Sequence, residues 1–161
     1  MILRTGQSDE CAAVEAVVTA AFLDYVRGIG RDWPGPHDWM AERLAKGEVH
    51  VAEGTEGRIL GMTALSQDEA ARTLTVDLLA VAPEAQGQGI GHALLAHAEA
   101  LARASGARAL HLHTVAKYDR LVRLYEGAGF CLTHTGPRPK GDDGHPRAFM
   151  RKWLDEQEEP A

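Results

Sequence analysis

Cysteine is scarce in this chain of 161 residues, and long apolar runs are missing. Of the two cysteines, Cys11 falls in a predicted helix and Cys131 in a predicted strand, and we expect neither a disulfide framework nor a cysteine-based metal site. We expect both to be small, buried apolar residues. The first ten residues are polar, and no stretch has the length and apolarity of a membrane span. We therefore expect no membrane association and a cytoplasmic location.

Basic residues are also in the minority. Lysine and arginine number 17 against 23 acidic residues, for a net charge of −6. This balance argues against nonspecific binding to nucleic acid, which depends on a basic surface, and mildly favours a cationic partner. His37, His134 and His145 are too scattered to predict a metal site. With 45% apolar residues, the chain is expected to form one domain over residues 1–154, followed by an acidic tail over 155–161.

Hydrophobic periodicity and turn residues predict alternating strands and helices. After a short strand, Ser8 or Asp9 is expected to cap a first helix, residues 25–36 to break regular structure, and Asp38 to cap a second helix ending before Gly47. Strands are predicted at 2–4, 49–52, 59–65, 73–81, 110–114, 130–135 and 148–153, and later helices at about 89–105 and 118–126. This order indicates an α/β domain of the α+β type, with a mixed central sheet and helices on both faces.

The most informative segment is a glycine-rich turn between a strand and a helix. The apolar run 78–81 ends near Pro83, and glycines follow at 87, 89 and 91 before an amphipathic helix begins. The first N–H groups of a helix lack intrahelical partners, and the helix dipole makes that end positive. Glycine permits close approach of a ligand and a positive φ. The segment therefore predicts a phosphate site.

Two familiar phosphate motifs do not fit. A dinucleotide fingerprint, G-x-G-x-x-G, starting at Gly87 fails at its sixth position, which is His92. A P-loop fails because no lysine follows Gly89 or Gly91. What fits is glutamine, two spacers, glycine, one spacer and glycine, at Gln86, Gly89 and Gly91. A structural glycine turn in an unrelated domain is the alternative.

This pattern resembles the acyl-CoA-binding motif of the GNAT superfamily of N-acetyltransferases. A second segment, 124–130, reads Leu-Tyr-Glu-Gly-Ala-Gly-Phe and resembles the family's LYxxxGF. The resemblance covers about residues 48–153, and more loosely the chain from residue 2. It implies a mostly antiparallel sheet of six to seven strands, in which the two strands ending near Val81 and Thr114 part to admit acetyl-CoA as co-substrate, without a metal.

The resemblance also implies which residues bind the co-substrate. Backbone groups of the strand would hold the pantetheine arm and polarise the thioester, and amides of the turn would hold the pyrophosphate. One departure concerns Tyr118, which stands where many relatives carry an asparagine that contacts the cofactor. The expected cofactor-binding residues are Leu79, Ala80, Val81, Gln86, Gly87, Gln88, Gly89, Ile90, Gly91 and Tyr118.

Tyr125 is the candidate general acid, because the tyrosine of the family's motif protonates the leaving thiolate and a phenol can do so. A core aromatic residue is the alternative role. Asp77 matches the place where some relatives carry a glutamate suggested to act as base, but it could equally point to solvent or pair with an arginine. His111 and His113, alternate residues of the next strand, are further candidate bases.

The acceptor is expected to be a primary amine of a small molecule or peptide. The segment 22–39 combines aromatic residues with carboxylates, which suits an ammonium group, and Tyr25, Trp33 and Trp39 are the candidate acceptor-binding residues. Ordinary packing of a helical hairpin explains the same residues. The alternatives to this enzyme are a non-catalytic module that senses acyl-CoA and an acetyltransferase of a protein acceptor. Many relatives dimerise, so a homodimer is expected.

Overall fold

The structure, a computed structural model, describes residues 1–154, and its strands form a seven-stranded sheet in the order β1-β2-β3-β4-β5-β7-β6. Strands β4 and β5 run parallel, whereas the pairs β1–β2, β2–β3, β5–β7 and β6–β7 are antiparallel. The mixed sheet agrees with the expected fold class. The acidic tail expected at 155–161 lies outside the described residues.

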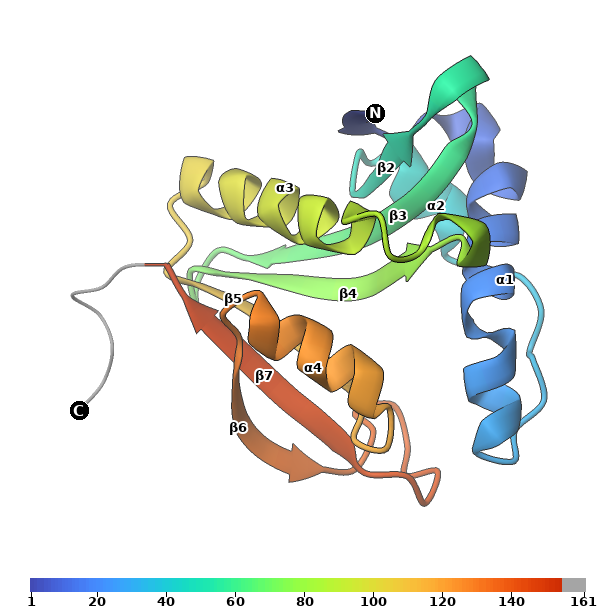
Figure 1. Ribbon diagram of the computed structural model, residues 1–161. Helices are drawn as coiled ribbons and strands as arrows, with labels where there is room; N and C mark the ends of the chain where they lie inside the picture. Colours follow the sequence, from blue (N-terminus) through green and yellow to red (C-terminus); the bar gives the residue numbers. More distant parts are fainter. Residues whose placement is uncertain (155–161) are drawn as a thin grey trace. The chain divides into compact units, whose positions relative to one another are not determined.

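The chain divides into two compact units, whose helices and strands carry the labels of Figure 1. The first comprises residues 1–65 and 78–97, and the second begins with residues 66–77 and resumes at residue 98. The first unit contains β1 (Ile2–Thr5), α1 (Cys11–Gly28), α2 (Met40–Ala45) and β2 (Val49–Glu53). The second contains β5 (Ala109–Val115), α4 (Asp119–Gly127), β6 (Cys131–Gly136) and β7 (Arg147–Trp153). Three elements continue from one unit into the other: β3 (Ile59–Asp68), β4 (Thr73–Val81) and α3 (Ile90–Ala104).

In the first unit, helices α2 and α3 cover opposite faces of the sheet. A Cβ added at Gly61 would lie 3.0 Å from Leu94 of α3, so α3 packs closely on the face to which Gly61 belongs. Met62, the next residue of β3, is directly opposite Val51 and therefore shares the other face with it. Leu44 of α2 and Val51 both lie against Gly6, which places α2 on that other face.

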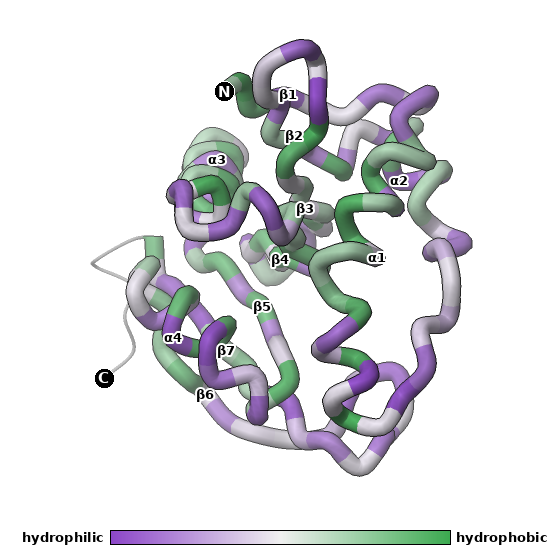
Figure 2. The backbone as a smooth tube through the Cα atoms, turned by 45° about the vertical axis from the view of Figure 1, so that its right-hand side comes forward, coloured by the Kyte–Doolittle hydropathy of each residue, from purple (hydrophilic) through white to green (hydrophobic). Residues whose placement is uncertain are grey.

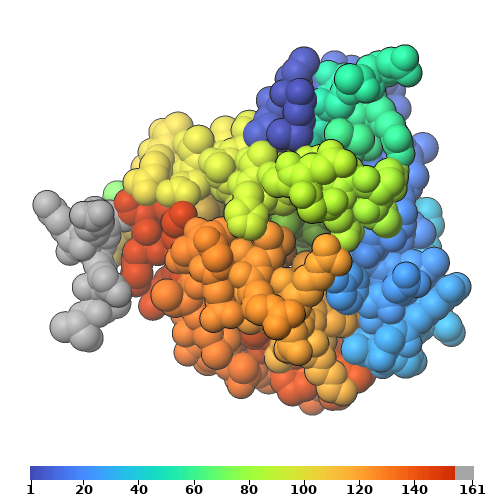
Figure 3. All heavy atoms as spheres, viewed as in Figure 1, coloured from blue at the N-terminus to red at the C-terminus, as the bar shows by residue number. Residues whose placement is uncertain are grey.

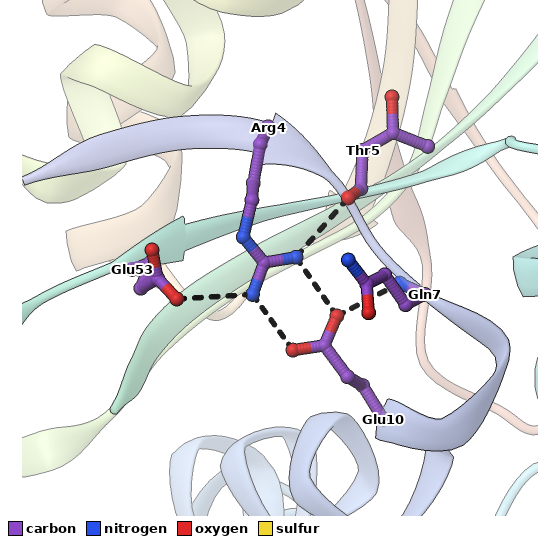
Figure 4. A network of polar contacts seen from close by, with 5 residues as sticks. All are labelled: Arg4, Thr5, Gln7, Glu10 and Glu53. Carbon is purple, nitrogen blue, oxygen red and sulfur yellow. Dashed lines mark hydrogen bonds and ion pairs between the residues drawn. The ribbon is translucent and has the colours of Figure 1, made fainter. Parts of the chain in front are cut away.

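Helix α1 begins and ends differently from the expectation. A 3₁₀ turn at Ser8–Glu10 precedes it, and Gln7 with Glu10 forms the capping box, so neither Ser8 nor Asp9 is the cap. Arg4 fixes this corner through two bonds to Glu10, of 2.8 and 2.7 Å, and one of 3.3 Å to Glu53 (Figure 4). Arg4 holds the pKa of the Glu10 carboxyl below its ordinary value.

The far end of α1 reaches Gly28, so the break expected from Tyr25 onward is wrong for residues 25–28. Apolar residues continue to recur at helical spacing there, and hydrophobic and hydrophilic stretches alternate along the helix (Figure 2). The Tyr25 ring also packs on Phe22, one turn earlier, at 6.2 Å. Asp38 does not cap α2, because Trp39 occupies the N-cap position and no side chain caps it.

In the second unit, the contacts of Lys152 show which face of the sheet the helices cover. Lys152 of β7 is paired with Leu110 of β5, and its ammonium group donates to Glu99 of α3 and to the carbonyl of Ala128, both at 2.9 Å. Helix α3 and the end of α4 therefore cover this face.

The expectation that both cysteines are buried is wrong, since Cys131 is exposed on the edge strand β6 and Cys11 is only half-buried.

Candidate functional site

The connection between β4 and α3 has the backbone that a phosphate ligand requires. A 3₁₀ turn at Pro83–Ala85 follows β4, and Gly87 and Gly89 each adopt a φ of 82° before α3 begins at Ile90. A Cβ built at Gly87 or Gly89 would meet no atom within 4 Å. Glycine is needed there for the left-handed backbone, not for space within the protein. Figure 3 shows this connection on the visible surface in yellow-green.

The amide groups of this turn are available to a ligand. Within the described part of the chain, the backbone N–H groups of residues 87–92 donate to no protein acceptor. They precede or begin α3, a helix of 15 residues, so the positive end of the helix dipole adds to their partial charges. Unpaired N–H groups in series at a helix N-terminus are suited to an anion, so the phosphate site remains a prediction that this backbone geometry is compatible with.

The Gln86 side chain makes a hydrogen bond that joins the glycine-rich turn to the end of β4. Its side-chain amide donates to the carbonyl of Val81 at 3.1 Å and so ties the turn to the end of β4. Leu79 and Ala80 are buried and Val81 is half-buried. The carbonyl of Leu78 accepts a bond of 2.9 Å from the Thr63 hydroxyl. The segment is thus held by specific bonds on both sides, while its turn amides stay unpaired.

Tyr125 lies inside the second unit, on α4. Its residue is only 6% exposed, and its ring meets Phe130 edge-on at a centroid distance of 6.1 Å. The backbone N–H of Phe130 donates to the carbonyl of Tyr125 at 3.0 Å, so the LYEGAGF segment folds back on itself. Tyr118 is the N-cap of α4 and is half-buried, as are Leu121 and Val122. These residues recur at helical spacing and so lie along one side of α4.

Asp77 belongs to the second unit and is exposed. The parallel ladder of β4 and β5 pairs Thr75 with His111 and ends where Val76 pairs with Leu112. Asp77 and His113 are the next residues of the two strands, and the negative charge of Asp77 acts on the His113 ring. The ladder stops where the family resemblance predicts the strands to part. Asp77 and His113 are therefore neighbours at the end of the paired region.

The surroundings of His113 favour its neutral form. The protein atoms packed around its ring lower its pKa most, and the positive charge of Arg147 lowers it further, while Asp77 opposes both effects. Arg147 is buried and binds the Asp143 carboxylate with two bonds, of 3.1 and 2.9 Å. The His111 pKa is also lowered, by burial and then by the charge of Arg151.

Two residues of the first unit that the sequence analysis did not select form a tight cluster. Glu15 of α1 is 6% exposed, and its carboxylate accepts the backbone N–H of His37 at 2.9 Å. The His37 Nδ1 lies 3.2 Å from both carboxylate oxygens. A glutamate between the buried residues Val14 and Val17 was a usable signal, because an acidic residue on an apolar helix face requires a partner.

His37 brings two of the three candidate acceptor-binding residues together. Its ring lies 6.0 Å from that of Trp33 and 4.9 Å from that of Trp39. The Arg43 guanidinium already lies over the Trp39 ring, at 5.1 Å from its centroid. Tyr25 instead packs on Phe22 within α1. Among the described residues, no cluster of three or more histidine, cysteine or acidic side chains could hold a metal.

Comparison with known proteins identifies the relatives of this chain. The profile of the Acetyltransferase (GNAT) family matches residues 14–130. The streptothricin acetyltransferase of Streptomyces lavendulae is 34% identical over 88 residues, which cover 55% of this chain and 47% of that protein. The match thus spans about half the length of that relative.

Within residues 1–154, every helix is too short or too polar to span a lipid bilayer.

Solved structures establish the fold. A nourseothricin acetyltransferase superposes with a TM-score of 0.75 at 24% identity, over 96% of this chain and 98% of the other. A Salmonella typhimurium protein solved with its cofactor acetyl-CoA superposes with a TM-score of 0.73 at 23% identity, over 100% and 98% of the two chains. At these identities the likeness concerns the fold alone.

Proposed function

The chain belongs to the acetyltransferase (GNAT) family, and we propose that it transfers the acetyl group of acetyl-CoA to a primary amine of a small molecule. The observation that carries the proposal is the series of unpaired N–H groups at residues 87–92, combined with the two left-handed glycines before α3. This arrangement fits the pyrophosphate of a coenzyme A ester. The net charge of −6 is overcome locally by amides and the helix dipole.

The donor would be held mainly by backbone groups. We assign the pyrophosphate to the amides of Gly87, Gln88, Gly89, Ile90 and Gly91, and the pantetheine arm to the main chain of Leu79, Ala80 and Val81. Gln86 supports the turn through its bond to the Val81 carbonyl. Tyr118, in place of the family's asparagine, would contribute its half-buried ring. Main-chain recognition explains why few side chains mark this site.

Tyr125 would act as the general acid. The amine nitrogen forms a bond to the thioester carbon, the carbon–sulfur bond breaks, and the leaving thiolate takes the phenolic proton of Tyr125. A phenol, with an ordinary pKa near 10, and a thiol, near 8.5, are matched for this transfer. The burial of Tyr125 supports the role, because water then competes less for the proton. Asp77 would serve the acceptor side, where its charge favours an ammonium group.

The acceptor class rests on the sequence relative. The 34% identity to a streptothricin acetyltransferase favours a small-molecule amine, and streptothricin is the first acceptor to test. Acidic residues outnumber basic ones by 23 to 17, which also suits a cationic molecule. The Trp33 and Trp39 pair, ordered by His37, would offer aromatic surface to it.

The proposal can be tested by measuring the free thiol released from acetyl-CoA with each of five acceptors in turn: streptothricin, a polyamine, an amino acid, an aminoglycoside and a peptide. We expect release that depends on one small-molecule amine. Tyr125→Phe should lower kcat by about a hundredfold while the Kd for acetyl-CoA changes little, because a general acid contributes of that order. Tight binding of acetyl-CoA without any acceptor-dependent release would instead indicate a sensing module, and release with the peptide alone would indicate a protein acceptor.

A further inference from the structure

The sheet face opposite α3 and α4 in the second unit carries a row of side chains across its strands. Parallel register places Thr75 and His111 on one face, and alternation places Asp77 and His113 on that same face. His113 is paired with Phe149, and their rings lie 5.3 Å apart. The Phe149 ring is stacked on His134 of β6 at 4.5 Å. Asp77, His113, Phe149 and His134 therefore lie side by side across β4, β5, β7 and β6, with Asp77 at one end of the row.

The helix that carries Tyr125 lies on the other face. Lys152, whose side chain binds the end of α4 and also α3, belongs to the Leu110 face, and Leu110 is adjacent to His111 along β5. Alternation along β5 then puts His111 and His113 on the face away from α4. A base on the His113 face and a proton donor on the α4 face would stand on different faces of the sheet, so that one can serve the incoming amine and the other the leaving sulfur.

We propose that His113 is the general base that deprotonates the acceptor amine, and that Asp77 acts through it as a positioning residue; this rests on the proposed acetyl transfer. His113 is accessible to solvent, although protein atoms also pack around its ring, and it is the residue beside Asp77 where the β4–β5 ladder ends. Histidine suits the task better than a carboxylate, because an imidazole ordinarily titrates nearer to neutral pH. His111 lies one row away, and its charged neighbour is the cation Arg151, which opposes proton uptake.

The protons balance as follows. A protonated acceptor nitrogen passes one proton to a ring nitrogen of His113, forms the bond to the thioester carbon, and loses its second proton as the amide forms. The thiolate takes one proton from Tyr125, and the phenolate recovers one from solvent. One proton is therefore released per turnover, and neither an oxidant nor a metal is consumed.

The pH dependence follows from the groups that face His113. They are Asp77 of β4 and Arg147 of β7, with His134 of β6 beyond Phe149. Since burial and Arg147 hold the pKa of His113 below its ordinary 6.5, its neutral, proton-accepting form predominates at pH 7. Removing the negative charge at position 77 lowers that pKa further. The acid limb of kcat/KM should then move to lower pH.

The experiment combines kinetics with streptothricin as acceptor and an NMR titration of the histidine rings. We expect His113→Gln to reduce kcat/KM for streptothricin at pH 7 by about a hundredfold or more, with the loss shrinking as rising pH deprotonates the amine in solution. Asp77→Asn should move the acid limb, and the NMR pKa of His113, to lower pH, because the negative charge that raises this pKa is removed. His111→Gln, the same residue type on the same strand and face, should keep the wild-type pH profile.

Three results would overturn the inference. The first is a wild-type profile in a folded His113→Gln variant. The second is loss of all activity in Asp77→Asn at every pH, which would make Asp77 itself the base. The third is an unchanged His113 titration in Asp77→Asn. If the wild-type protein acetylates neither streptothricin nor any other amine of the panel, the proposed function fails and this inference with it, whereas the three results above leave acetyl transfer intact.

Discussion

Replacing Gly89 with alanine separates backbone strain from ligand binding, because the chain offers a matched control. Gly89 has a φ of 82° and Gly106, which follows α3, has a φ of 79°. At both positions an added Cβ would meet no atom within 4 Å. The two substitutions thus impose the same left-handed backbone on an L-residue without a steric clash. Only Gly89 lies among the unpaired amides that we assign to the pyrophosphate.

The expected magnitudes differ for folding and for binding. An L-residue in the left-handed region costs about 1–2 kcal/mol, and the lower entropy of the unfolded alanine chain returns up to about 1 kcal/mol. Both variants should therefore lose roughly 1 kcal/mol of stability, a fall in Tm of about 2–4 °C for a chain of this size. Gly89→Ala should in addition weaken a charged hydrogen bond of about 1.5–3 kcal/mol, which raises the Kd for acetyl-CoA by about tenfold or more.

Calorimetric titration with acetyl-CoA, alongside thermal melts of the same samples, measures both quantities. We expect Gly106→Ala to bind acetyl-CoA like the wild type although it melts as early as Gly89→Ala. Equal affinities for the two variants would refute the assignment of the pyrophosphate to this turn. A much larger loss of stability in Gly89→Ala would mean that the turn supports the fold and not the ligand.

Two further predictions concern groups outside this turn. Glu15→Gln should lower the free energy of unfolding in urea by about 1–3 kcal/mol, because His37 loses a buried charged partner. Glu42→Gln, on an exposed ion pair, should leave the free energy of unfolding nearly unchanged, and equal effects of the two substitutions would contradict the importance of the Glu15–His37 pair. Burial and the nearby His97 lower the pKa of His50 to about 4. Between about pH 4 and pH 6.5, this histidine is therefore protonated in the unfolded state but neutral in the native state. Stability should fall as pH drops from about 6.5 to about 4, by up to about 3 kcal/mol, and a His50→Gln variant should lose this part of the dependence in melts across that range.

Local signals explain what the sequence could predict. The strand, turn and helix around Gly89 follow from an apolar run, glycines and helical periodicity, all within about 30 residues of one another. The segment 124–130 is equally local, and the helix predicted over 118–126 corresponds to α4, which ends at Gly127. The mostly antiparallel pairing of six to seven strands came from the family resemblance, and the order of the strands in the sheet was not predicted.

Contacts between distant segments explain what the sequence could not predict. Glu15 and His37 are 22 residues apart, and nothing in their local patterns pairs them. Asp77 and His113 meet only through the register of two parallel strands joined by a helix. The exposure of Cys131 depends on β6 being the edge of the sheet, which local propensity does not determine. Each of these placements depends on tertiary contacts between segments that are distant in the sequence.

The central claim is that the chain acetylates a small-molecule amine with acetyl-CoA. Mass spectrometry of streptothricin after incubation with the protein and acetyl-CoA tests it most directly, with a hydroxylamine step to distinguish an amide from an ester. We predict a gain of one acetyl group that survives hydroxylamine and is greatly reduced with Tyr125→Phe. An unmodified acceptor, both for streptothricin and for the other amines of the panel, would contradict the account.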